Sequence, residues 1–179
     1  MASCPVAGRN TSPRGSGDAA APFVHHRQVR WADADPAAIA YTARLPEMCL
    51  EAIEAWCRDR LGHGWYEMNR DLGIGTPFVH LSLDFRSPVT PRDALTLTVL
   101  LHRTGGSSLH LGVVARLADA GRVAFEGRFV CAFVRAGAMK AIPIPARFRA
   151  ALAREVAIAA NQAPVTSPAA RGRRRAQSA

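Results

Sequence analysis

The sequence lacks the long apolar runs and the cysteine pairs that define several large classes of protein. No window of its 179 residues reaches about 18 consecutive apolar residues, so no membrane-spanning segment is expected. No apolar run of about 7–15 residues follows Arg9 and Arg14, so a secretory signal is not expected either and the cytoplasm is the expected location. The four cysteines show no Cys-x-x-Cys spacing, and we expect Cys49, Cys57 and Cys131 to be reduced thiols in apolar surroundings.

Several motifs that carry chemistry are also absent. There is no Walker loop, no Gly-x-Gly-x-x-Gly after a strand, no Gly-x-Ser-x-Gly elbow and no His-Glu-x-x-His. Their absence removes the commonest nucleotide-binding, serine-hydrolase and zinc-protease interpretations. A metal site is not expected, because Asp33 and Asp35 have no further His, Asp or Glu nearby at ligand spacing.

Lysine is almost missing, since 22 of the 23 basic residues are arginine and Lys140 is the only lysine. The formal charge of +9 is +1 in residues 1–22, +4 in residues 157–179 and +4 in between. Both ends consist mostly of small and polar residues, which predicts two tails around one domain of residues 23–156. One alternative function is nucleic-acid binding through the arginines of residues 171–175, but this run is too short for sequence specificity, so no specific nucleic-acid partner is expected.

The core shows one helical pattern followed by alternating patterns. A strand is predicted at residues 23–31. Apolar residues then recur at spacings of three and four, which predicts a helix of about four turns with one buried stripe: Leu45, Met48, Cys49, Ala52, Ile53, Trp56 and Cys57. A short helix is predicted at residues 65–72 and another at residues 148–156. Alternating residues predict strands at 79–85, 95–101, 109–117 and 123–133, and the short Gly-containing links between the later strands indicate antiparallel neighbours. The prediction is an α+β fold in which the sheet wraps around the long helix.

The sequence Asp33-Ala34-Asp35-Pro36 lies in the turn that leads into this helix. A carboxylate placed there can face the unpaired amides of the helix start, and the same amides can hold an oxyanion. Pro46 has no N–H, so the amides of residues 41–44 are candidate free donors. The alternative is that both aspartates only shape the turn or cap the helix.

Residues 29–56, VRWADADPAAIAYTARLPEMCLEAIEAW, resemble the opening motif of the hotdog-fold acyl-CoA thioesterases of the 4-hydroxybenzoyl-CoA thioesterase type. The resemblance continues in order through GTPFVHLSLDF, DALTLTVLL and AIPIP. It implies a hotdog fold, in which an antiparallel sheet is wrapped around one long central helix. It also implies hydrolysis of an aromatic or short acyl-CoA, with coenzyme A present only as part of the substrate and no other cofactor.

The resemblance also implies roles for single residues. Asp35 corresponds to the aspartate that acts on the thioester, as a nucleophile or as a base toward water. Thr42 occupies the position whose backbone amide polarises the thioester carbonyl. Glycine is usual where Ala38 stands, so a positive φ at Ala38 would strain the turn by about 1 kcal/mol.

Further residues are implied in substrate binding. Lys140 matches a position that contacts the nucleotide end of coenzyme A. The family's arginine cluster is replaced by Gly105, Gly106 and Ser107, so phosphate contacts there would come from backbone amides or from the hydroxyls of Ser107 and Ser108. Tyr41 is a candidate for the wall of the acyl pocket.

The family binds its substrates in clefts between subunits, so the partners expected are an acyl-CoA and further copies of this chain, as a dimer that pairs into a tetramer. One alternative stays open: a non-hydrolytic, dehydratase-like hotdog protein that binds acyl-CoA or acyl-carrier thioesters. Such hydratases favour a His and Asp pair near the helix, and no histidine occurs between Asp35 and His63.

Overall fold

The structure, a computed structural model, describes residues 21–162. Its elements are, in chain order, β1 (Phe23–Gln28), a 3-10 helix (Trp31–Asp33), α1 (Arg44–Leu61), α2 (Trp65–Arg70), β2 (Ile74–Gly75), β3 (Phe78–Phe85), β4 (Ala94–Thr104), β5 (Ser108–Leu117), β6 (Val123–Ala132), β7 (Val134–Arg135), β8 (Lys140–Ala141) and α3 (Ala146–Ala160).

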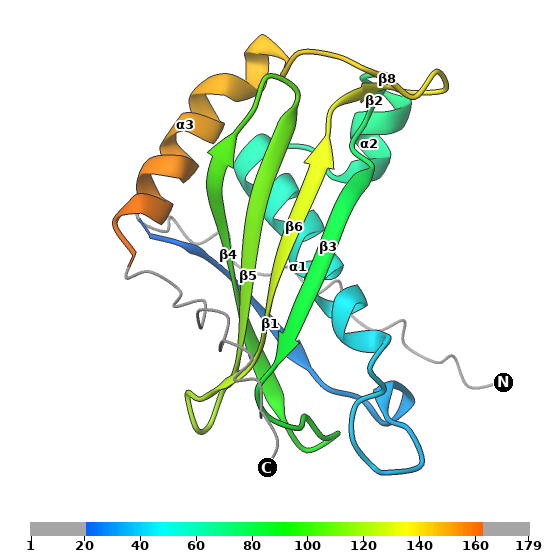
Figure 1. Ribbon diagram of the computed structural model, residues 1–179, viewed down its shortest axis with the longest axis vertical. Coiled ribbons are helices and arrows are strands. Elements are labelled where there is room, and N and C mark those ends of the chain that lie inside the picture. Colours follow the sequence, from blue (N-terminus) through cyan, green and yellow to red (C-terminus); the bar gives the residue numbers. More distant parts are fainter. Residues whose placement is uncertain (1–20, 163–179) are drawn as a thin grey trace, which may run out of the picture.

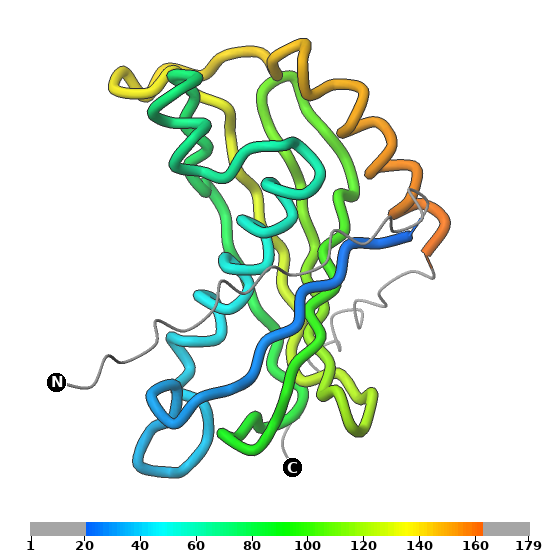
Figure 2. The backbone as a smooth tube through the Cα atoms, turned by 180° about the vertical axis from the view of Figure 1, so that it is seen from behind, coloured from blue at the N-terminus to red at the C-terminus, as the bar shows by residue number. Residues whose placement is uncertain are grey.

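The main sheet has the strand order β1-β4-β5-β6-β3, and every neighbouring pair is antiparallel. The sheet curves in front of α1 in Figure 1. From behind, in Figure 2, α1 lies across the opposite face of the same strands, and β1 crosses beside it. The predicted α+β architecture, an antiparallel sheet around one long helix, is confirmed.

The core fills the space between α1 and the inner face of the sheet. The predicted stripe of α1 is buried along its whole length, and Trp56 is fully buried. Phe125 and Phe129 of β6 are also fully buried, because residues an even number of positions apart on one strand point to the same face, here the inner one. Cys49, Cys57 and Cys131 are free thiols within this core, as expected from their apolar surroundings.

Several details differ from the prediction, including the end of α2, at Arg70 instead of residue 72, and the end of β4, at Thr104 instead of residue 101. β1 ends at Gln28 instead of residue 31, because the chain turns into the 3-10 helix. α3 has 15 residues, from Ala146 to Ala160, so it is longer than the predicted helix of residues 148–156 and extends into the predicted tail of residues 157–179. A second sheet, β2-β7-β8, was not predicted, since strands of two residues are too short to show an alternating pattern. Most of both predicted tails lies outside the described residues.

The strand β3 forms an uncovered apolar edge of the main sheet. Leu81, Leu83 and Phe85 pair with the inward-facing positions of β6, so their side chains belong to the inner face, as the alternation predicts. A register irregularity interrupts the alternation at Val79. Leu81 nevertheless remains 41% exposed and Phe85 52% exposed. In the single chain, this edge of the inner face is therefore left open to solvent.

Across residues 21–162, none of the helices combines the length and the hydropathy needed to cross a bilayer.

Candidate active site

The motif that contains Asp35 folds back on itself as a small closed loop. Ala34 and Ala40 form an isolated antiparallel bridge, and the amide of Asp35 donates a 2.9 Å hydrogen bond to the carbonyl of Ile39. The amide of Ala40 donates a 2.7 Å bond to the carbonyl of Val89, in the connection between β3 and β4. The backbone around Asp35 is thus fixed both within the loop and against the β3–β4 connection.

Asp35 itself is half-buried within this loop. Its Oδ1 accepts a 2.8 Å hydrogen bond from the amide of Ala37, which is the geometry of a turn-forming aspartate. Its Oδ2 accepts no hydrogen bond from residues 21–162. One carboxylate oxygen therefore shapes the turn while the other is available to a substrate or a water molecule.

The start of α1 leaves two backbone donors unused. No side chain caps this helix start. Of the four candidate amides, Tyr41 donates to the carbonyl of Asp33 at 2.7 Å and Arg44 donates to the carbonyl of Tyr41 at 2.8 Å, so the expectation that they are free was wrong for these two. The amides of Thr42 and Ala43 donate to no described residue. They lie at the positive end of the helix dipole, where a developing negative charge is stabilised.

Ala38 lies in the left-handed region, with φ of 60°. This is the position at which the related motif usually has glycine, and the strain expected there is present in the structure. The backbone keeps this conformation because the hydrogen bonds of the loop, including the 2.9 Å bond from the Ala38 amide to the Asp35 carbonyl, hold it in place.

The first aspartate of the motif has a different environment. Asp33 is buried and accepts two hydrogen bonds from the guanidinium of Arg27, at 2.8 and 3.1 Å, and one of 2.8 Å from the amide of Arg30. Arg27 lowers the pKa of the Asp33 carboxyl by hydrogen bonding to its charged form, an effect that burial opposes. The structural alternative, an aspartate that shapes the turn, is correct for Asp33.

The sequence analysis missed Arg27 and its second partner, Glu51, whose Oε2 lies 2.8 Å from the Arg27 Nε. The sequence did contain a signal for the role of Arg27. Arg27 is in phase with Phe23 and His25, the less exposed positions of β1, and a charged residue at such a position needs a partner.

The predicted substrate-binding residues lie in two places. Tyr41 immediately precedes Thr42 and its side chain is 54% exposed. Lys140 begins β8 on the surface, and Ser107 and Ser108 lie at the turn between β4 and β5, where the Ser108 hydroxyl is 3.3 Å from the His110 Nε2.

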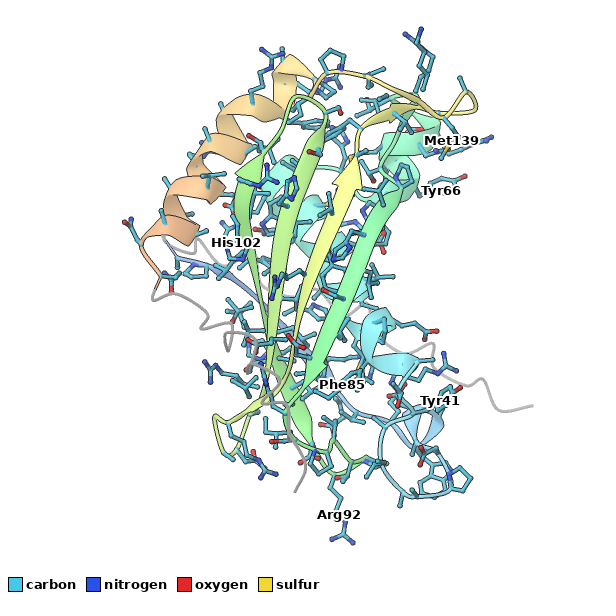
Figure 3. All side chains as sticks on the ribbon, viewed as in Figure 1. Tyr41, Tyr66, Phe85, Arg92, His102 and Met139 are labelled. Carbon is cyan, nitrogen blue, oxygen red and sulfur yellow. The ribbon has the colours of Figure 1, made fainter. Side chains whose placement is uncertain are left out.

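These two places are at opposite ends of the sheet. Figure 3 shows Tyr41 and Phe85 near one end and Tyr66 and Met139 at the other. The eight residues of β3 alone span about 23 Å at roughly 3.3 Å per residue. Within one chain, the structure therefore does not bring Lys140, Ser107 or Ser108 to Asp35.

No group of three or more His, Cys, Asp or Glu side chains in residues 21–162 is arranged to hold a metal ion. The groups available for chemistry here are the free carboxylate oxygen of Asp35 and the unused backbone amides of Thr42 and Ala43 at the start of α1.

A sheet wrapped around a central helix, with these groups where the helix begins, defines the chain as a hotdog-fold protein suited to carbonyl chemistry. Its residues 29–152 match the thioesterase-like superfamily. The chain belongs to this superfamily.

Three similar proteins agree with this assignment to the superfamily. A thioesterase-superfamily structure from Jannaschia sp. CCS1 is 40% identical, with a TM-score of 0.71, over 81% of this chain and 97% of that one. A 1,4-dihydroxy-2-naphthoyl-CoA thioesterase structure from Synechocystis shares the fold at 22% identity and a TM-score of 0.68, over 73% of this chain and 95% of that one. The 1,4-dihydroxy-2-naphthoyl-CoA hydrolase of Picosynechococcus sp. is 33% identical over 42% of this chain. That match covers only 51% of the hydrolase, about half its length.

The expected hotdog superfamily is confirmed. The narrower 4-hydroxybenzoyl-CoA type is not confirmed, since the relatives are named for 1,4-dihydroxy-2-naphthoyl-CoA or for the superfamily alone.

Proposed function

We propose that this protein hydrolyses an aromatic acyl-CoA thioester to the free acid and coenzyme A. The observation that carries the proposal is the free amide of Thr42, at the start of α1, next to the loop that presents the unbonded Oδ2 of Asp35. A thioester carbonyl bound between them would meet a nucleophile or base on one side and a hydrogen-bond donor on the other.

The chemistry needs only these groups and water. Asp35 either attacks the carbonyl carbon or removes a proton from the attacking water, and the Thr42 amide stabilises the negative charge that develops on the carbonyl oxygen. The carbon–sulfur bond then breaks, and the coenzyme A thiolate gains either the proton that Asp35 took from water or one from the solvent. If Asp35 was the nucleophile, the acyl group is left on it as a mixed anhydride, which water hydrolyses to the free acid and the regenerated carboxylate.

An aromatic acyl group is supported by two observations. Tyr41, the residue before Thr42, is 54% exposed, so its ring is available to stack against a flat aromatic acyl group. The Picosynechococcus relative is named for 1,4-dihydroxy-2-naphthoyl-CoA, an aromatic thioester. We extend this substrate class, not the particular compound, to the present chain.

The site is completed in this proposal by a second copy of the chain. Antiparallel pairing of β3 with the same strand of another copy would cover the exposed side chains of Leu81 and Phe85 and pair the open edge. It would also bring the end of the sheet that carries Lys140, Ser107 and Ser108 next to the Asp35 end of the partner subunit. The separation of these residues within one chain is the reason to expect at least a dimer.

The test is thiol release from a panel of thioesters: 1,4-dihydroxy-2-naphthoyl-CoA, 4-hydroxybenzoyl-CoA, benzoyl-CoA and aliphatic acyl-CoAs. We expect the wild type to hydrolyse the aromatic substrates, and Asp35→Asn to lower kcat by roughly 10²–10⁴-fold, the usual contribution of a positioned acid or base. Thr42→Ala should keep kcat within about threefold, because the donor is a backbone amide. Asp119→Asn, in the exposed turn after β5, is the matched control.

Three results would contradict the proposal. They are no hydrolysis of any substrate by the wild type, equal rates for wild type and Asp35→Asn, and hydration of an enoyl-CoA without thiol release. The last result would favour the dehydratase-like alternative.

A further inference from the structure

The guanidinium of Arg27 joins two segments that meet at the candidate active site. Its terminal nitrogens donate to both carboxylate oxygens of Asp33, at 2.8 and 3.1 Å, on the loop that leads to Asp35. Its Nε donates to the Oε2 of Glu51 at 2.8 Å, on α1, the helix that begins just after Thr42. One side chain of β1 therefore holds both the loop and the helix.

Asp33 passes this constraint to the reacting groups. Its carboxylate is fixed by Arg27 and by the amide of Arg30, and its own carbonyl accepts the amide of Tyr41 at 2.7 Å. Asp35 follows Asp33 by two residues, and Thr42 follows Tyr41 directly. A displacement of Asp33 would therefore move both the Asp35 carboxylate and the Thr42 amide.

The Arg27–Asp33 pair is also sheltered from solvent, unlike most ion pairs of the described residues. The exposed fractions of the two side chains are 14% and 9%, against 47% and 53% for the Arg44–Glu47 pair at the start of α1. A sheltered, two-point contact between a planar guanidinium and a carboxylate fixes direction as well as distance. The surface pair on the helix cannot supply such a constraint.

We propose that Arg27 is a positioning residue that sets the geometry between the Asp35 carboxylate and the Thr42 amide. This inference rests on the proposed thioester hydrolysis. Arg27 does not touch the substrate; it acts through Asp33 on the loop and through Glu51 on the helix. Lysine at this position could contact one carboxylate but could not reproduce the planar two-point contact while also reaching the other.

The first test is the effect on kcat and on KM. Because a displacement of about 1 Å can cost about a hundredfold in rate, we expect Arg27→Gln to lower kcat at least tenfold with KM within about threefold, and Arg27→Lys to lower it less. Arg58→Gln, which breaks an exposed pair with Glu54 near the far end of the same helix, should leave both constants unchanged. Glu155→Gln removes charge from a buried partner of α1 and should lower thermal stability without lowering kcat, which separates positioning from general destabilisation.

The second test does not depend on activity. The amide of Tyr41 is bonded in the native loop, so its hydrogen exchange reports whether Asp33 is held in place. We expect Arg27→Gln to accelerate exchange of this amide at least tenfold, and Arg58→Gln and Glu155→Gln to leave it unchanged.

The proposal is overturned if Arg27→Gln keeps the wild-type kcat, if its kcat loss is matched by Glu155→Gln at equal loss of stability, or if the Tyr41 amide stays protected. Should the wild type hydrolyse none of the thioesters, the proposed function fails by that result alone. The exchange of the Tyr41 amide then still decides whether Arg27 holds the loop.

Discussion

The indole nitrogen of Trp56 donates a 2.9 Å hydrogen bond to the carboxylate of Glu155, and both side chains are buried where α1 meets α3. Arg60 lies beside them, with its Nε 3.3 Å from the other oxygen of the same carboxylate. A residue of the central helix is thereby tied to the last helix of the fold, 99 positions later in the chain.

Replacing Trp56 with phenylalanine should lower the free energy of unfolding by about 1–3 kcal/mol, because the buried Glu155 oxygen loses its donor. Urea unfolding followed by circular dichroism measures the change. Glu54→Gln, which removes an exposed pair with Arg58, should change it by about 0.5 kcal/mol or less. Equal effects of the two substitutions would contradict a special role for the buried contact.

Replacing Ala38 with glycine should stabilise the protein by about 0.5–1 kcal/mol, because an alanine at φ of 60° is strained where glycine is not. The neighbouring Ala37→Gly, at a residue without positive φ, should instead lower stability by about 0.4–1 kcal/mol through the entropy of the unfolded chain. Thermal unfolding should show a gain of stability for Ala38→Gly and a loss for Ala37→Gly. A loss of stability in both variants would argue against it.

Lowering the pH should remove the part of the free energy of unfolding that depends on the ionised carboxylate of Asp33. Its pKa is lowered in the folded state, chiefly by hydrogen bonds from Arg27, so the unfolded chain binds the proton more readily. The stabilisation is complete above the ordinary carboxyl pKa of 3.8 and is lost as the pH falls below it through the lowered value. Asp33→Asn should therefore be less stable than the wild type at pH 7, and the difference should shrink toward pH 3 in urea titrations. A difference that does not change with pH would contradict this account.

If copies of the chain pair through β3 as proposed, Leu81→Glu should give monomers and abolish the proposed thioester hydrolysis, because it places a charge on the open β3 edge. Light scattering coupled to size-exclusion chromatography measures the assembly. Val24→Glu is a matched control, since Val24 is 42% exposed on β1, at the other edge of the sheet, and Leu81 is 41% exposed. A Leu81→Glu protein that keeps the wild-type mass and activity would exclude pairing through β3.

Local patterns in the sequence were sufficient for the architecture. The apolar stripe from Leu45 to Cys57 identified α1 and its buried face, and the alternating runs with short Gly-containing links identified an antiparallel sheet. These features depend on period and on turn chemistry, which neighbouring residues express by themselves. The two-residue strands of the small sheet carry no such pattern, so they could not be predicted.

The candidate site was predictable only in part. The proline at residue 46 pointed to free amides before α1, and the structure, in which no side chain caps this helix start, leaves those of Thr42 and Ala43 unused. Which amides are free depended on a contact across the loop, since the carbonyl of Asp33 takes the Tyr41 amide. Sequence spacing cannot show such a contact.

The sequence by itself determined the helix, the sheet around it and the loop of Asp35 at the helix start, because each follows from the order of apolar, polar and turn-forming residues within a few positions. Only the tertiary structure decided that Asp33 is held by Arg27, that Lys140 lies at the far end of the sheet from Asp35, and that β3 is left uncovered. The physical reason is that burial and ion pairing depend on which distant segments meet, and α1 is too narrow to cover all the strands that wrap around it.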